Sequence, residues 1–184
     1  LSVTGELGYE IHCRMGDHIA LRRLLLKAGA ECGIGEFGFN ALLSLRLEKG
    51  FGIWSAEFTQ GYTPGMTGMD RWIDWGKEQF IGQAAAIKER DGNGPSQKLV
   101  MLEIDADDAD ASGYEPVWDN NSLVGFVTSG GYGHTINKSL AMALVNNDLA
   151  KEDQRLKVHV VGVEKDAKVI KTSPYDPDGI VMRV

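Results

Sequence analysis

Six short apolar segments separated by turn-forming residues fill the second half of this 184-residue chain, and they restrict its fold more than any other feature. Runs of turn formers, at residues 119–121 and 130–133, lie between some of them. Short strands at such spacing predict a small β-barrel or sandwich. The predicted strands cover residues 99–104, 115–118, 123–128, 140–145, 156–163 and 167–171.

A clear boundary precedes this β-rich part. Residues 91–96 read Asp-Gly-Asn-Gly-Pro-Ser, a run of turn formers that neither a helix nor a strand accommodates. We therefore expect a first region at residues 1–91, a linker at 92–97 and a β-rich region at 98–184.

The first region contains both strand-like and helix-like patterns. Tyr9, Ile11 and Cys13 alternate with polar residues, which predicts a strand with one buried face. Asp17 can cap a following helix that Gly29 would end. The apolar residues of that helix are expected to face a core, and they are Leu21, Leu24, Leu25 and Ala28. Farther along, the sequence predicts a turn at 63–66, a strand at 69–75 and a helix at 83–90.

An arginine interrupts the apolar stripe of another predicted helix. The stripe comprises Phe39, Leu42, Leu43, Arg46 and Leu47, and the opposite, polar side comprises Asn40, Ser44 and Glu48. A guanidinium is costly to bury, so Arg46 requires an anionic partner or a ligand. A third interpretation is that its stem packs while its charged end reaches water.

Composition excludes several classes of function. The net charge of −7, without a basic cluster, argues against a nucleic-acid binder. No apolar run is long enough to span a bilayer, so we expect no membrane partner. Cys13 and Cys32 lack a C-x-x-C spacing and are expected to be buried free thiols in a reducing compartment, which favours a cytoplasmic location. The start at Leu1 suggests a fragment of a longer protein.

Familiar catalytic and metal motifs are absent. Residues 33–38 read G-x-G-x-x-G, but a predicted helix precedes them where a dinucleotide site requires a strand, so we interpret them as a connecting loop. There is no H-E-x-x-H, no G-x-S-x-G and no paired metal cysteines. The acidic run at 105–110 lacks the glycine and terminal glutamate of an EF-hand and is expected to be a solvated loop. No metal site is predicted.

Several motifs, in order along the whole chain, resemble those of the glycine-cleavage T-protein (aminomethyltransferase) family. They are T-G-E-L-G-Y-E at 4–10, S-L-R-L-E-K-G at 44–50, F-I-G at 80–82, T-S-G-G-Y-G at 128–133, K-S-L-A at 138–141 and P-Y-D-P at 174–177. Two of them look most like the folate-binding portions of dimethylglycine and sarcosine dehydrogenases. The resemblance implies an α+β chain, with part of a folate-binding α/β domain followed by a small C-terminal antiparallel β-barrel.

The same resemblance implies a set of binding residues. The glutamate at the Glu10 position binds the pterin ring in the family, and its two oxygens match adjacent pterin N–H donors. From the residues alone, Glu10 is interpreted as a solvent-facing strand residue, and only the resemblance favours the folate role. The arginine at the Arg46 position lies in the folate site, where it supplies rigid donors. Trp54 and Glu57 complete the predicted binding set. Catalytic residues stay unassigned, because the family's essential aspartate belongs to an N-terminal half that we expect to be missing here.

The implied function is transfer of a one-carbon unit from a methylated or aminomethylated amine to tetrahydrofolate. The expected partners are folate, a small methylated amine and the N-terminal remainder of the same protein. FAD is expected only if an upstream oxidase domain exists. One alternative is the folate-binding module of a flavin-dependent dimethylglycine or sarcosine dehydrogenase. Another is a non-catalytic folate-binding protein with an assembly or regulatory role.

Overall fold

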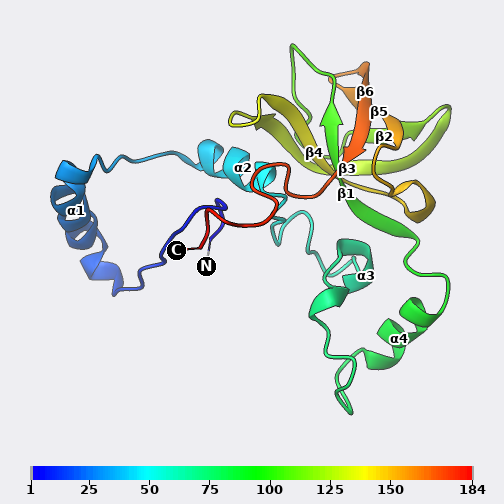
Figure 1. Cartoon of the computed structure of the whole chain (residues 1–184), viewed down its shortest axis with the longest axis horizontal. Helices are drawn as coiled ribbons and strands as arrows, with labels where there is room; N and C mark the ends of the chain where they lie inside the picture. The colour runs from blue at the N-terminus through cyan, green and yellow to red at the C-terminus, as the bar shows by residue number, and fades with distance from the viewer. Residues whose placement is uncertain (1, 184) are drawn as a thin grey trace.

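A closed antiparallel barrel forms the second half of the chain, in a computed structural model that describes residues 2–183 (Figure 1). The strand order around the barrel is β1-β4-β3-β2-β5-β6. This closure confirms the predicted α+β architecture and selects a barrel over a sandwich. The strands are β1 (Gln97–Ile104), β2 (Pro116–Asp119), β3 (Ser122–Gly133), β4 (Lys138–Asn146), β5 (Arg155–Val160) and β6 (Val163–Ile170).

Alternation along each strand produces the barrel's core. On β1 the even-numbered residues from Val100 to Ile104 point inward, and on the neighbouring β4 the odd-numbered residues from Ala141 to Val145 do so. These side chains are almost fully removed from water, which supplies the main driving force for closure. Each of the six predicted strands overlaps an observed strand, but the one predicted at 156–163 runs through the turn between β5 and β6, and β3 extends beyond the predicted residue 128 to Gly133.

The glycine run at 130–133, which we expected to be a turn, lies inside β3. The strand contains an irregularity between Val127 and Ser129. A side chain on Gly130 would collide with the backbone carbonyl of Ala111, and one on Gly125 with that of Leu144. These two glycines permit close backbone approach rather than chain reversal.

Four helices occupy the first region. They are α1 (His18–Gly29), α2 (Phe39–Glu48), α3 (Pro64–Thr67) and α4 (Gln83–Asp91). Three of them, α1, α2 and α4, follow the prediction closely. The predicted turn at 63–66 is the start of α3, where the Thr63 hydroxyl accepts a hydrogen bond from the Met66 N–H at 3.2 Å. The predicted strand at 69–75 is wrong, since this segment contains a 3-10 turn at Asp70–Trp72 instead.

The N-terminal predictions on burial are also wrong. No strand forms at residues 9–13, where Tyr9 is 86% exposed, because no other strand lies beside this segment in the described part of the chain. Helix α1 lies apart from the barrel (Figure 1), and none of its residues is buried by the part of the chain that the structure describes, so Leu24 is 62% exposed. Cys13 and Cys32 are exposed free thiols for the same reason.

A membrane-crossing helix would have to be longer and more apolar than any found in residues 2–183.

Candidate functional site

The C-terminal end of α2 is buried against the barrel. Phe39, on the predicted apolar stripe, is 71% exposed, whereas Glu48, on the predicted polar side, is 1% exposed. Burial therefore depends on position along α2 and not on its face, which corrects the amphipathic interpretation. Leu47 anchors this end by packing against Met101 and Leu140 on the outer surface of the barrel.

Arg46 has an anionic partner inside this contact. Its Nη1 lies 3.5 Å from Oε2 of Glu57 and donates to the carbonyl oxygen of Phe51 at 3.2 Å. The side chains of Arg46 and Glu57 are 4% and 0% exposed. Burial lowers the pKa of the Arg46 guanidinium, and the neighbouring carboxylate acts in the opposite direction. Of the three interpretations of Arg46, the structure contains the buried ion pair.

Glu57 connects a loop to the barrel wall. One of its oxygens accepts hydrogen bonds from the hydroxyls of Thr128, at 2.6 Å, and Ser129, at 2.5 Å. The other accepts from the Ile53 N–H at 2.9 Å. Both oxygens are thus occupied, and residues 53–58 are fixed to β3. Sequence reasoning missed Thr128 and Ser129, although two adjacent hydroxyls within an apolar strand indicate a buried polar partner.

Glu48 makes a second connection from α2 to the barrel. Its carboxylate accepts hydrogen bonds from the N–H groups of Thr135, at 2.6 Å, and Ile136, at 3.1 Å. The Thr135 hydroxyl also donates to it, at 2.7 Å. The turn between β3 and β4 is therefore held by a helix residue that the sequence placed on a solvent-facing side.

The other two predicted binding residues are exposed. Trp54 is 84% exposed, on a turn where the N–H groups of Ala56, Glu57 and Phe58 all donate to the Ile53 carbonyl. The Glu10 side chain is 53% exposed, and His12 lies 3.7 Å from it. Thus Arg46 and Glu57 meet inside the protein, whereas Glu10 and Trp54 keep their polar and aromatic groups available to a ligand.

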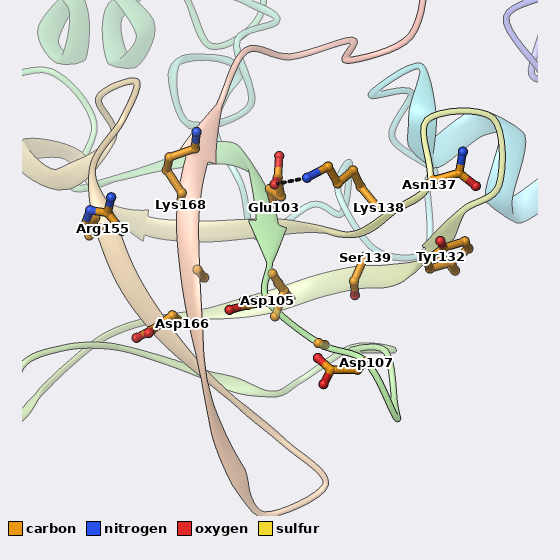
Figure 2. A pocket seen from close by; sticks show the side chains of 13 residues that line it. Glu103, Asp105, Asp107, Tyr132, Asn137, Lys138, Ser139, Arg155, Asp166 and Lys168 are labelled. Atoms are coloured by element: carbon orange, nitrogen blue, oxygen red, sulfur yellow. Dashed lines mark hydrogen bonds and ion pairs between the residues drawn. The ribbon is translucent and has the colours of Figure 1, made fainter.

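A polar pocket of about 570 Å³ lies elsewhere, on the barrel (Figure 2). Its walls carry charges of both signs, including Asp105, Asp107, Asp166 and Arg155, and the Lys138 ammonium pairs with Glu103 at 2.8 Å. None of the four predicted binding residues lines it. Across residues 2–183, no group of three or more histidine, cysteine or acidic side chains is arranged to hold a metal ion.

Two family models match the chain. Residues 1–77 match the GCVT N-terminal domain, and residues 97–176 match the glycine cleavage T-protein C-terminal barrel domain. The chain is 37% identical to the mitochondrial dimethylglycine dehydrogenase of Rattus norvegicus, over 93% of the chain and 20% of that protein. It is 33% identical to the aminomethyltransferase of Geobacillus sp. (strain WCH70), over 94% of the chain and 47% of that protein.

A solved structure agrees with these matches. The glycine cleavage system aminomethyltransferase T from Bartonella henselae superposes with a TM-score of 0.77 and 25% identity, covering 85% of this chain and 44% of that one. The chain thus spans less than half the length of these relatives. The dehydrogenases are named as mitochondrial, so a cytoplasmic location for this chain stays a prediction.

Proposed function

Because this chain belongs to the glycine cleavage T-protein family, we propose that it forms part of a protein that transfers a one-carbon unit to tetrahydrofolate from a methylated or aminomethylated amine. The observation that carries the proposal is the match of both T-protein regions, in order, within one chain. Since the relatives are longer, the activity is proposed for the whole protein that contains this chain.

Glu10 is the residue that we assign to the pterin. Its carboxylate is half exposed and, within residues 2–183, has no partner closer than His12 at 3.7 Å, so both oxygens can accept hydrogen bonds from a ligand. A carboxylate matches the side-by-side N–H donors of a pterin ring. A buried or fully paired glutamate would lack this capacity.

Trp54 supplies a second type of contact. Its indole projects from a turn that Glu57 fixes to β3, so a planar ligand can stack on it without first ordering the loop. The guanidinium of Arg46 is turned inward and paired with Glu57. We therefore assign Arg46 and Glu57 the role of holding this turn in place for the ligand.

The dehydrogenase relatives suggest a second candidate, the folate module of a flavin-dependent amine dehydrogenase. The glycine-rich residues 33–38 do not fit a flavin-binding dinucleotide loop, because they connect a 3-10 turn to α2 and no strand precedes them within residues 2–32. Flavin absorbance in the whole protein would favour the dehydrogenase. Tetrahydrofolate binding without one-carbon transfer would favour the non-catalytic alternative.

The direct test measures tetrahydrofolate affinity by calorimetry in the protein that contains this chain. We expect Glu10→Ala to weaken binding by about tenfold or more, because pterin donors lose a charged acceptor. Glu31→Ala is the matched control, since Glu31 is also an exposed glutamate of the N-terminal part. Equal affinity of the Glu10 variant and the control would refute the pterin assignment.

A further inference from the structure

Three distant segments of the chain meet beside the C-terminal end of α2. They are the N-terminal residues 2–6, Lys49 at the end of α2 and the C-terminal tail at residues 171–183. The first described residues and the C-terminal tail lie next to each other there in Figure 1, where Tyr175 contacts Glu6. Three of the motifs discussed above, T-G-E, L-E-K-G and P-Y-D-P, contribute to this contact.

A buried ion pair lies at its centre. The Nζ of Lys49 is 2.8 Å from Oδ2 of Asp176 and also donates to the Asp176 carbonyl oxygen. The two side chains are 2% and 9% exposed. The carboxylate of Asp176 further accepts from the N–H groups of Ile180 and Val181. An ion pair this well enclosed and hydrogen-bonded resists separation far more than a surface pair.

Tyr175 extends the contact to the N-terminal segment. Its N–H donates to the Glu48 carbonyl oxygen at 3.0 Å, which fixes the tail to α2. Its hydroxyl donates to the Glu6 carboxylate at 3.0 Å, and this interaction raises the pKa of the tyrosine. Tyr175 therefore links residue 6 to the tail.

Gly5 packs closely against the side chain of Lys49. It adopts φ +82°, and a Cβ added there would lie 2.8 Å from both Cγ and Cδ of Lys49. The stem of Lys49 therefore occupies the space that a side chain at position 5 would need, and glycine is required for both the backbone angle and the close approach. The N-terminal segment is packed directly on the residue that binds Asp176.

We propose that Lys49, Tyr175 and Asp176 form a clasp that sets the position of the N-terminal segment and, through it, of Glu10. They are positioning residues for the tetrahydrofolate site, and this part rests on the function proposed above. Glu10 follows Glu6 by four residues, which span at most about 14 Å, so the anchor limits where Glu10 can move. In the described part of the chain, residues 7–13 have no backbone hydrogen bonds to other elements, so the clasp is the nearest hydrogen-bonded anchor on their N-terminal side.

The first experiment follows amide exchange at Gly5, whose N–H donates to the Ser2 hydroxyl at 3.0 Å. We expect Asp176→Asn to accelerate Gly5 exchange about tenfold or more, because the charged acceptor of Lys49 is lost. Tyr175→Phe should also accelerate it while leaving the ion pair in place. Asp178→Asn, an equal charge change at an exposed neighbour, is the control and should have no effect. Unchanged Gly5 exchange in folded Asp176→Asn and Tyr175→Phe would overturn the clasp.

The pH dependence of Gly5 amide exchange shows whether the Lys49–Asp176 ion pair, and not packing alone, holds the N-terminal segment. The Lys49 ammonium and the tail amides lower the pKa of Asp176 below the ordinary aspartate value of about 3.9. Glu6 and Glu48 are the other charged groups beside Tyr175. The contribution of Asp176 is therefore complete above pH 3.9 and is lost as the pH falls through the lowered value. Acid should accelerate Gly5 exchange, relative to a barrel amide, in the wild type but not in Asp176→Asn. Identical acid profiles in the two proteins would contradict the clasp.

The last experiment measures tetrahydrofolate affinity in the protein that contains this chain. We expect Tyr175→Phe to weaken binding several-fold, and Asp178→Asn to leave it unchanged. If Glu10→Ala weakens binding but Tyr175→Phe does not, the positioning role is wrong and the folate assignment survives. If Gly5 exchange responds but Glu10→Ala has no effect on affinity, the folate assignment is wrong and the clasp survives.

Discussion

Arg46 shows how far a single residue can be interpreted from sequence. Its place among apolar residues left an anionic partner, a ligand or a charged end that reaches water as the possibilities, because a lone buried guanidinium is too costly, and the structure contains the first of these. The sequence could not identify Glu57, which reaches it only through the folded turn at residues 53–58. Glu48 is the converse case, since a polar residue on a polar helix side is buried by a turn that comes 87 residues later. Partners made by tertiary contacts leave no local signal.

Removing the charge of Glu57 should destabilise the fold strongly. We expect Glu57→Gln to lower the free energy of unfolding by about 3–5 kcal/mol, because the buried Arg46 charge is left uncompensated. Urea denaturation measures this. Glu152→Gln, at an exposed position, is the control and should change stability little.

The double variant Arg46→Met with Glu57→Gln sharpens this test. Removing the guanidinium together with the carboxylate leaves no unpaired buried charge, so the double variant should lose less stability than the two single losses added together. Additive losses would mean that the pair does not act as a unit.

Local sequence patterns predict the helices and the barrel strands of this chain, but they wrongly predict two strands outside the barrel. Helix α1 begins after Asp17 and ends at Gly29 as predicted, because helical periodicity is a local signal, although the Asp17 side chain makes no capping hydrogen bond. The expected strands at 9–13 and 69–75 had suitable residues, but among residues 2–183 no strand lies beside either of them to complete a ladder. Pairing between distant segments decides whether a strand forms. Within the barrel, each apolar segment finds such a partner.

The hydrogen bonds between Glu48 of α2 and the β3–β4 turn lead to a prediction about stability. We expect Glu48→Ala to cost about 1–3 kcal/mol, because the N–H groups of Thr135 and Ile136 lose their acceptor. Exchange at the Ile136 amide should accelerate beyond that of amides in β1. Glu48→Gln, which keeps an acceptor oxygen, should have the smaller effect. Equal destabilisation by the two variants would show that the hydrogen bonds are not what the turn requires.

The two parts of the molecule differ in how much core they contain. The barrel encloses its own apolar interior, whereas the N-terminal part exposes large apolar side chains such as Met15 at 90% and Trp72 at 76%. Exposed apolar surface of this extent is typical of an interface. We propose that further sequence of the T-protein type covers it in the whole protein. The linker at residues 92–97 that divides the two parts stays a prediction.

Limited proteolysis of the 184-residue chain tests that division. We expect early cleavage within residues 7–38, which are exposed. A fragment that contains residues 97–170 should survive, because its strands are hydrogen-bonded to one another in a closed barrel. Mass spectrometry identifies the fragments. Early cleavage within β3 or β4 would contradict an independently stable barrel.

The last prediction concerns how tightly this 184-residue chain binds tetrahydrofolate when the rest of the protein is absent. The two groups that we assign to the ligand, Glu10 and Trp54, lie on separate exposed segments, and the described residues contain no hydrogen bond or ion pair that joins those segments into one enclosed cavity. Ligand affinity depends on contacts that are held in place before binding, since ordering them afterwards consumes free energy. The 184-residue chain should therefore bind tetrahydrofolate much more weakly than the whole protein, as measured by calorimetry on both. Micromolar binding by the chain alone would show that the residues present already form a sufficient site.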